Sequence, residues 1–533
     1  MVKVTNLADV HLRFIPNKLC LRHPGFTRLG AGHTRPDLHA RREILAIGEN
    51  PASAFCGRRG LRYIWGGPAE SRTMTLQQPA SAPASAAIPA RVPLSNTPLG
   101  IWGSLRAGRR NVLELIPEIA TRVPMLSGRT AKRWHMVMDP TALRRILRDR
   151  VADYPKSLVT KLILEPAIGD SLFIAEGAEW MWQRRTAAPV FSHRNVAALA
   201  PVMSAAAERA ADRVAQAGPG RAMDMYEAMV ATTFEVISDV TFSGGDGFDR
   251  AAVHRAIEGY IAQAARVSLL DILGAPRWVP RPSRVLTGAA MRDMKRLADA
   301  AIERRRKDGA RPVPDLLDLL LEGEDPKSGR RMTTDELRDN LLTFIVAGHE
   351  TTALTLAWAL YLCAFDQDVQ DAARTEAQAV LAGRAATAAD VPHLPLIRRI
   401  VDETLRMYPP AAFLSRTAMV RDELCGREIR PGDTVILPIY ALHRHHTHWP
   451  DPDRFDPARF ADPKAIDRYG YLPFGDGPRI CIGANFALQE AVIILATLLA
   501  RFRFRQVPGK EPAPVMILTL RPEGGVWLTA EPM

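Results

Sequence analysis

The stretch Phe-Gly-Asp-Gly-Pro-Arg-Ile-Cys-Ile-Gly, residues 474–483, decides how this chain is interpreted. It places one cysteine, Cys481, in a glycine-rich loop, with an arginine two residues before it. At ordinary residue frequencies, such a pattern occurs by chance in about one in ten thousand chains of this length. The loop therefore predicts a dedicated site for the Cys481 sulfur, and a thiolate presented in this way suits an iron ion.

Each residue type in this loop suits a cysteine that holds a haem iron. Gly475 and Gly477 permit a positive-φ backbone that points amide N–H groups at a sulfur. A strong helix former follows Cys481, so we expect the cysteine at a helix N-terminus, where the thiolate is favoured. Arg479 can form a forked pair with a haem propionate, and Phe474 can shield the sulfur from water. Without these neighbours, a single cysteine would be interpreted as a small buried hydrophobe.

On this loop the chain resembles the cytochrome P450 family, the haem-thiolate monooxygenases. The resemblance implies a mostly α fold with small β-sheets, which forms one haem domain over residues 99–533. It also implies haem b (iron protoporphyrin IX) as the cofactor, with Cys481 as the ligand of its iron. Four more motifs of the family follow in the expected order.

The first of these motifs lies inside an apolar helix. Thr333 and Glu336 form a plausible capping box, and an apolar run carries the helix into the interior as far as Ala-Gly-His-Glu-Thr-Thr, residues 347–352. A glycine, an acid and two threonines weaken a buried helix, and such violations of local rules are expected at functional sites. We expect His349 to serve packing or pocket lining and not to be a ligand.

The resemblance gives this helix its role at the distal face of the haem. Ala347 and Gly348 would lie over the haem, with Gly348 leaving room for dioxygen. Glu350 and Thr351 would be the catalytic residues that help deliver protons. In the alternative interpretation, the Thr351 hydroxyl bonds back to the carbonyl four residues earlier, and Glu350 forms an ordinary ion pair.

The second motif predicts a buried charged triad. Glu403 and Arg406 share a helix face, which alone is a common surface pair. The proline-rich segment 452–460 resembles the family segment whose arginine completes a triad with that pair, so Arg459 would be the third member. Ala458 departs from the glutamate often found there, but the arginine is kept.

The third motif supplies cations for the haem propionates. Trp180 and Arg184 have the W-x-x-x-R spacing that sets an indole and a guanidinium one turn apart, and they resemble the propionate-binding helix of the family. Arg416 stands on a predicted strand and is a further candidate. Together with Arg479 these arginines are three cations for two carboxylates; otherwise they would be surface residues.

The fourth motif and three other segments carry structural expectations. Residues 426–435 predict a hairpin with Pro-Gly at its turn. Four histidines follow within residues 443–448, but no carboxylate or thiolate stands at a typical zinc spacing, so a zinc site is not expected there. By the resemblance, residues 134–139 are the first strand, 150–176 the loop over the haem, and 245–290 a mobile lid.

Composition agrees with a large helical protein of the soluble bacterial kind. The chain has 533 residues, of which 47% are hydrophobic and 24% charged, and its five cysteines suggest no disulfide framework. The best candidate membrane span, residues 484–500, is interrupted by polar residues. We expect a cytoplasmic monomer with no membrane span and no nucleic-acid partner.

The N-terminal residues match nothing in the family. Residues 1–73 carry net charge +7 of the +12 of the whole chain, without a sustained helical or strand period. We interpret them as a basic extension that is disordered or precedes the natural start at Met74, with a transit peptide as the alternative. The Pro/Ala/Ser-rich residues 74–98 are interpreted as a flexible lead-in.

The implied reaction is reductive activation of dioxygen and hydroxylation of an apolar small molecule such as a fatty acid or terpenoid. Electrons from NAD(P)H would come through a separate reductase and a ferredoxin or flavodoxin, which Arg184 and Arg185 could help dock. The alternatives are a peroxide-dependent peroxygenase or isomerase and, without a visible output domain, a haem sensor. The apolar residues proposed to line the pocket are Leu162, Ile163, Leu164, Leu172, Phe173, Phe344, Ala347 and Phe413.

Overall fold

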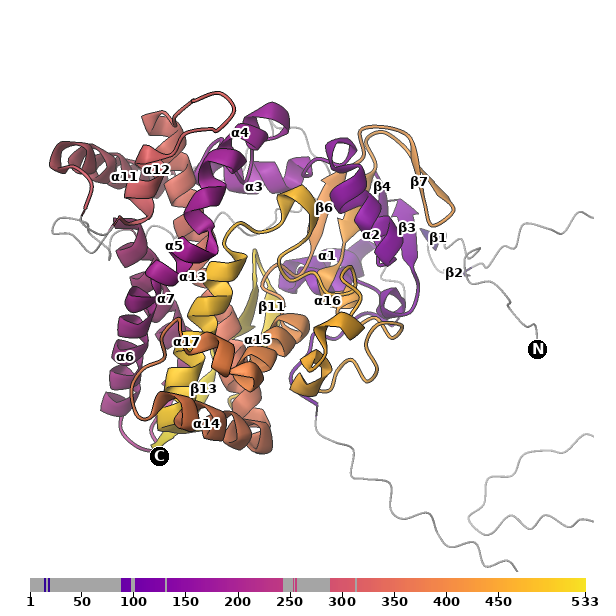
Figure 1. Ribbon diagram of the computed structural model, residues 1–533. Coiled ribbons are helices and arrows are strands. Elements are labelled where there is room, and N and C mark those ends of the chain that lie inside the picture. Colours follow the sequence, from indigo (N-terminus) through magenta and orange to yellow (C-terminus); the bar gives the residue numbers. More distant parts are fainter. Residues whose placement is uncertain are drawn as a thin grey trace, which may run out of the picture. The chain divides into compact units, whose positions relative to one another are not determined.

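A 32-residue helix, α13 (Thr334–Phe365), runs through the middle of the computed structural model (Figure 1). The predicted capping box is formed: the Thr333 hydroxyl accepts from the Glu336 N–H, and the Glu336 carboxylate accepts from the Thr333 N–H. Most side chains beyond the first turn are buried, which explains the nearly continuous apolar run. The structure describes residues 14–15, 18–19, 88–96, 101–129, 132–242, 253, 255, 288–311 and 314–533.

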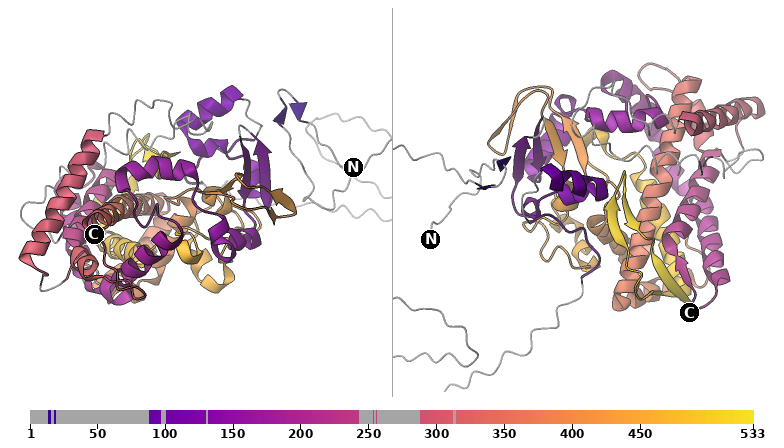
Figure 2. Two further views of the ribbon diagram at one scale, coloured as in Figure 1. Left: turned by 90° about the horizontal axis from the view of Figure 1, so that it is seen from above. Right: turned by 180° about the vertical axis from the view of Figure 1, so that it is seen from behind.

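The structure describes further helices, some of which pack on α13. They are α1 (Ile101–Arg110), α2 (Pro140–Arg144), α3 (Leu158–Ile168), α4 (Gly177–Ala187), α5 (His193–Ala198), α6 (Ala200–Ala217), α7 (Met225–Phe242), α11 (Gly288–Asp308), α12 (Leu316–Glu322), α14 (Gln367–Leu381), α15 (Pro395–Met407), α16 (Ile439–Leu442) and α17 (Ala484–Arg501). Helices α7, α15 and α17 pack directly on α13, and α6 covers both α7 and α17 (Figure 2). The central helix is therefore enclosed on several sides.

The described strands form small sheets. They are β1 (Phe14–Ile15), β2 (Lys18–Leu19), β3 (Met125–Arg129), β4 (Arg133–Val137), β5 (Ala222–Asp224), β6 (Leu414–Thr417), β7 (Asp422–Leu424), β8 (Arg427–Ile429), β9 (Thr434–Leu437), β10 (Phe502–Gln506), β11 (Ala513–Met516), β12 (Leu520–Glu523) and β13 (Trp527–Pro532). Among the described residues the largest sheet has the order β3-β4-β9-β6, with β4 and β9 parallel and the other pairs antiparallel. The expected mostly α fold with small β-sheets is confirmed.

The hairpin predicted over residues 426–435 is wrong. Strand β8 pairs with β7 across Cys425 and Gly426, which both have positive φ, whereas β9 pairs with β4 and β6. The Pro431–Gly432 turn carries the chain from one sheet to another. The Gly432 N–H of this turn donates to the Ala418 carbonyl at 2.8 Å. Ala418 directly follows β6, so this bond holds the turn against the end of β6.

Two expectations for the N-terminal half need correction. Residues 134–139 were predicted as the first strand, but β3 precedes β4 in the same sheet. Residues 150–176 were predicted as a loop, yet α3 lies within them. Ser157 caps α3 by accepting from the Thr160 N–H, and four apolar side chains of the helix are buried. The predicted lid at 245–290 and the interpretations of residues 1–73 and 74–98 fall largely or wholly outside the described residues.

Helix α17 is the one described helix that is long and apolar enough to cross a membrane. Of its apolar stretch, 61% is buried inside the protein, against α6, α13 and α14. Its hydrophobicity is therefore accounted for by its place in the core.

Candidate functional site

The loop before α17 is closed on itself. The Cys481 N–H donates to the Phe474 carbonyl at 3.0 Å. Gly475 and Gly477 have φ of 70° and 73°, as the sequence predicted. At Gly477 a side chain is also excluded by contact, because a Cβ there would stand 2.0 Å from the Leu147 carbonyl oxygen. The loop is thus held in one shape, with Phe474 packed half-buried on the core.

The backbone N–H that hydrogen-bonds to the Cys481 sulfur belongs to Gly483, not to Gly475 or Gly477. The N–H groups of Gly475 and Gly477 are used within the loop, whereas the Gly483 N–H bonds to Cys481. The Cys481 side chain is exposed, although crowding by the surrounding protein raises the pKa of its thiol, and the Gly483 N–H and the charges of Arg184 and Lys156 lower that pKa. The sulfur is therefore open to a bound metal, whose charge would favour the thiolate.

Cationic side chains from separate elements gather near Cys481. Arg416 of β6 and Lys156 are paired through their backbones; Arg416 is buried and Lys156 is half-buried. Burial lowers the pKa of Arg416 to about 10, and it lowers the pKa of Lys156 far below its usual range, helped by the charges of Arg416 and Arg479. Burial lowers the pKa of Arg184 of α4, and the nearby charge of a Cys481 thiolate raises it.

Sequence reasoning missed Lys156 and Glu176. The Lys156 ammonium donates to the Phe173 carbonyl at 2.5 Å and lies 3.4 Å from the centre of the Phe173 ring. The Glu176 carboxylate pairs with Arg479 and accepts from the Lys156 N–H at 3.0 Å. Neither residue has a neighbour in the sequence that signals an anion site.

The charge balance around Cys481 fits haem. Four cations, Lys156, Arg184, Arg416 and Arg479, influence one another or Cys481, and Glu176 is the one carboxylate that acts on them among the described residues. Closely spaced positive charge in such excess, on one buried and three half-buried side chains, favours anionic partners. The two propionates of a haem whose iron is bound by Cys481 would supply them, so the residues present suit this cofactor.

The Trp180 ring contacts a different arginine from the one predicted. The sequence paired it with Arg184, one turn away on α4. In the structure the Arg479 guanidinium lies 4.2 Å from the centre of the Trp180 ring, a cation–π contact. Arg479 also donates to the Ala175 carbonyl at 2.8 Å. The indole therefore orients the arginine of the cysteine loop.

The middle of α13 has one accessible face. Ala347 is exposed although most of its helix is buried, and Val346, Gly348 and Thr351 are half-buried. Gly348 was expected to leave room for dioxygen, but a Cβ there would meet the Ile237 side chain of α7 at 3.3 Å. The missing side chain of Gly348 therefore lets α7 approach, and the open face comes from Ala347.

The two residues assigned to proton delivery are held by other groups. The Thr351 hydroxyl donates to the Ala347 carbonyl at 2.8 Å, which is the back-bonded alternative. Glu350 is 2% exposed, accepts from the Thr519 hydroxyl at 2.7 Å and pairs with Arg521, which is the ion-pair alternative. His349 is buried, as expected, with its Nδ1 at 2.8 Å from the Ile345 carbonyl.

The structure brings the three predicted triad residues together. The Glu403 and Arg406 side chains are both 0% exposed and joined by a forked pair at 2.6 and 2.8 Å. The Arg459 Nε lies 3.5 Å from Glu403 Oε1. Arg406 also donates to three backbone carbonyls, those of His443, Pro452 and Arg454. The triad therefore ties α15 to the segment that leads to the cysteine loop.

The histidines and Arg185 have structural partners. His443 Nε2 accepts from the Leu472 N–H at 2.8 Å, and its Nδ1 faces the Arg406 carbonyl. Arg185 was expected to help dock an electron carrier, but it forms a forked pair with Asp325 at 2.6 and 2.8 Å. The docking role of Arg185 stays a prediction, because the side chain is still 30% exposed beside this pair.

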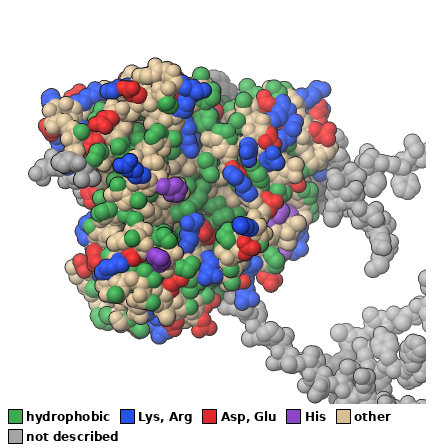
Figure 3. All heavy atoms as spheres, in the orientation of Figure 1, with side chains coloured by type: hydrophobic (Ala, Val, Ile, Leu, Met, Phe, Trp, Pro, Cys, Tyr) green, Lys and Arg blue, Asp and Glu red, His purple; other side chains and the backbone are tan. Residues whose placement is uncertain are grey.

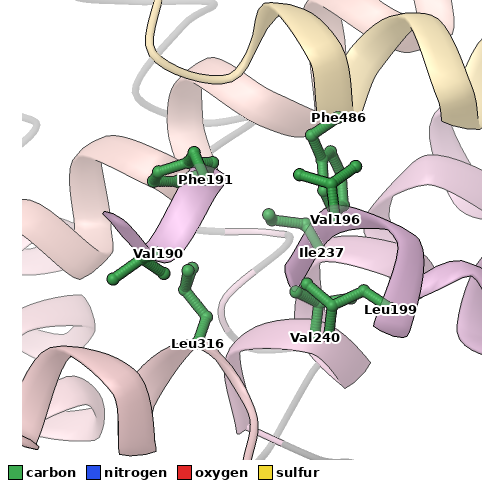
Figure 4. Close-up of a pocket in the computed structure, with 8 residues that line it drawn as sticks. All are labelled: Val190, Phe191, Val196, Leu199, Ile237, Val240, Leu316 and Phe486. Atoms are coloured by element: carbon green, nitrogen blue, oxygen red, sulfur yellow. The ribbon is translucent and has the colours of Figure 1, made fainter. Parts of the chain in front are cut away.

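A small apolar cavity lies on the α7 side of α13 (Figure 4). It holds about 10 Å³, which is no more than a single water needs, so it is a packing gap and not a substrate site. None of the residues predicted to line the substrate pocket borders it. Its lining is Val190, Phe191, Val196, Leu199, Ile237, Val240, Leu316 and Phe486.

On the face seen in Figure 3, hydrophobic side chains gather at the centre with Lys and Arg around them.

An exposed cysteine in the loop that leads into α17, a cluster of cations around it and an open face in a long central helix suit a haem-thiolate protein. The Cytochrome P450 family profile matches residues 122–529. The chain belongs to the cytochrome P450 family, and membership implies a haem cofactor and monooxygenase chemistry.

Known relatives agree with this assignment. Cyclooctat-9-en-7-ol 5-monooxygenase of Streptomyces melanosporofaciens is 30% identical over 79% of this chain and 90% of its own length. Putative cytochrome P450 132 of Mycobacterium tuberculosis is 33% identical over 74% of this chain and 87% of its own. Among solved structures, the heme domain of cytochrome P450DA has a TM-score of 0.72 at 26% identity and covers 83% of this chain and 98% of that one.

Proposed function

We propose that this monooxygenase hydroxylates an apolar small molecule of the fatty-acid or terpenoid class with electrons from a separate redox partner. The observation that carries the proposal is the accessible face of α13 at Ala347, with the apolar Phe413 and Phe344 among the residues proposed to line the pocket. A small side chain at the exposed centre of the helix leaves room for a ligand, and apolar surroundings exclude a charged one. The name of the Streptomyces relative, which denotes oxidation of cyclooctat-9-en-7-ol, supports this substrate class.

Five residues would hold the haem. Cys481 would be the iron ligand, and Arg479, Arg416, Arg184 and Lys156 would meet the propionates. Haem bound in this way supplies reductive activation of dioxygen, with the thiolate as electron donor to the iron. The Gly483 N–H would temper the charge of the sulfur. Trp180 and Phe474 would orient Arg479 and exclude water from the sulfur.

Thr351 and Glu350 would deliver protons to the dioxygen side of the site. Thr351 is half-buried on the same face as Ala347, one helical turn away. Its hydroxyl can leave the Ala347 carbonyl by rotation about χ1 and donate toward the open face. Glu350 must leave Thr519 and Arg521 before it can exchange protons with Thr351, so delivery would require a local rearrangement.

NAD(P)H would be the electron source, through a reductase and a ferredoxin or flavodoxin. The positive balance of the chain, +12, suits an acidic carrier. Arg185 is 30% exposed although it is paired with Asp325, so it could take part in docking such a carrier. A monomer in the cytoplasm fits a diffusible carrier of this kind.

A peroxide-dependent reaction is the second candidate. The specific observation in its favour is that both proton-delivering groups are tied to other residues, because peroxide brings its own protons and needs no relay. Apolar substrates should first be titrated against the ferric Soret band of the haem-loaded protein. Hits should then be incubated either with ferredoxin, reductase, NADPH and dioxygen or with hydrogen peroxide alone. Product that needs the reductase supports the monooxygenase, and equal product with peroxide alone supports the second candidate.

A further inference from the structure

The carboxylate of Glu176 lies within the cation cluster near Cys481. The Arg479 guanidinium donates to Glu176 Oε2, and the Lys156 N–H donates to Glu176 Oε1 at 3.0 Å. The Lys161 ammonium of α3 lies 3.6 Å from the same Oε1. These partners belong to the cysteine loop, to the segment before α3 and to α3 itself, so contacts from three parts of the chain hold the Glu176 charge in place.

Glu176 stands at the N-cap of α4, but its side chain does not cap the helix. An N-cap side chain usually accepts from an N–H of the first helical turn. The Glu176 carboxylate is bound to the cations instead, and the carbonyl of Ala175 accepts from the same Arg479 guanidinium at 2.8 Å. The helix therefore gives no reason for an acid at this position, whereas the cations do.

The cations have other contacts that do not involve Glu176. The Arg479 guanidinium lies 4.2 Å from the centre of the Trp180 ring. The Lys156 ammonium donates to the Phe173 carbonyl at 2.5 Å. Replacing the Glu176 carboxylate by an amide of the same shape should therefore change the charge of the cluster more than its geometry.

We infer that Glu176 lowers the reduction potential of the haem bound at Cys481, because its charge opposes the cations that meet the propionates. The inference rests on the proposed haem site. Reduction adds one negative charge to the haem, which a nearby carboxylate disfavours and nearby cations favour. The charge of Glu176 raises the pKa of three of these cations, Lys156, Arg416 and Arg479. Its removal would leave them more free to favour the reduced haem.

This charge has a consequence for the redox partner. In the step concerned, the reduced carrier loses one electron and the ferric haem gains it, without transfer of a proton or change of a bond. The step is favourable only when the potential of the carrier is below that of the haem. The Glu176 side chain is 26% exposed, so water weakens its effect but does not abolish it. Glu176 thus restricts electron uptake to carriers of low potential.

The test is the midpoint potential of the haem-loaded protein, measured without substrate or dioxygen by reductive titration with indicator dyes. Glu176→Gln keeps the shape and removes the charge. A unit charge in a protein shifts an equilibrium about fivefold to tenfold over roughly 10–15 Å, so the potential should rise by about 40–60 mV for this one-electron couple.

A second pair of variants separates charge from shape. Glu176→Asp and Glu176→Asn both place a short side chain that is favoured at an N-cap, and they differ in charge alone. The potential of Glu176→Asn should exceed that of Glu176→Asp by a similar amount, and this pair decides the question if Glu176→Gln does not take up haem. A merely structural role would move both members of the pair equally.

Glu179→Gln is the matched control, because Glu179 lies on the same helix and its side chain is 48% exposed, 3.7 Å from Arg330. Water screens an exposed charge, so this variant should keep the parent potential. The carbon-monoxide difference spectrum of every protein is recorded first. If the thiolate band is present throughout and both amide variants have the potentials of their carboxylate counterparts, the inference on Glu176 is wrong and the haem site stands. If the parent itself lacks that band, the proposed haem site fails and the inference fails with it.

Discussion

Replacing the carboxylate of the buried triad, Glu403→Gln, tests whether this triad holds the cysteine loop in place. Glu403 is 0% exposed, accepts two bonds from Arg406, accepts from the Asp456 N–H at 2.9 Å, and faces Arg459 at 3.5 Å. Glutamine keeps the shape but leaves two buried guanidinium groups without their carboxylate. Breaking a buried ion pair by removing one partner costs about 3–5 kcal/mol.

The assay is reversible urea unfolding of the haem-loaded protein, together with the haem content of the purified protein. A loss of about 3–5 kcal/mol is a large part of the roughly 5–15 kcal/mol that stabilises a typical protein, so haem content should fall as well. Glu428→Gln is the matched control, because Glu428 is a surface residue paired with Arg430. This substitution should lower the free energy of unfolding by no more than about 0.5 kcal/mol. This reasoning would be refuted if the free energy of unfolding of Glu403→Gln were within about 1 kcal/mol of the parent value and the haem content were full.

Four other changes have defined outcomes. Burial and the Arg406 charge hold the pKa of His443 at about 3, below the roughly 6.5 of an unfolded histidine, so the unfolded state binds the proton first as pH falls. About 4–5 kcal/mol of stability present above pH 6.5 should be lost towards pH 3, and His443→Gln should flatten this part of an acid-unfolding curve. Cys481→Ser should abolish the carbon-monoxide difference band that is typical of thiolate-bound haem. Thr351→Ala should keep that band but divert NAD(P)H electrons to peroxide, measured as peroxide formed per NAD(P)H. Lys156→Met should speed haem transfer to a haem-scavenging protein, because it removes one propionate partner.

Local patterns predicted the parts of the site whose residues are close in sequence. The cysteine loop needs positive φ at Gly475 and Gly477, and both requirements can be read from residue type. The capping box of α13 and the Glu403–Arg406 pair follow from spacing along a helix, because residues three apart share a face. Such features depend on backbone geometry alone.

The parts that were missed depend on the fold. Lys156 reaches the site because its backbone pairs with Arg416, more than 250 residues later in the chain. Trp180 was assigned to the arginine one turn away, but tertiary packing put Arg479 over its ring. The role of Gly348 was assigned from the motif, yet its missing side chain faces α7. These contacts join segments far apart in the sequence, so no local pattern shows them.

The motif in α13 shows why partners matter more than residue type. Glu350 is unfavourable in a buried helix, and the sequence alone suggests that function explains it. The structure supplies a second reason, since Thr519 and Arg521 satisfy the carboxylate and so remove most of the cost of burying it. A residue stabilised in this way is held in its resting position by the contacts that make it tolerable. The contacts with Thr519 and Arg521 are therefore one reason why an acid is tolerated at this buried position of α13.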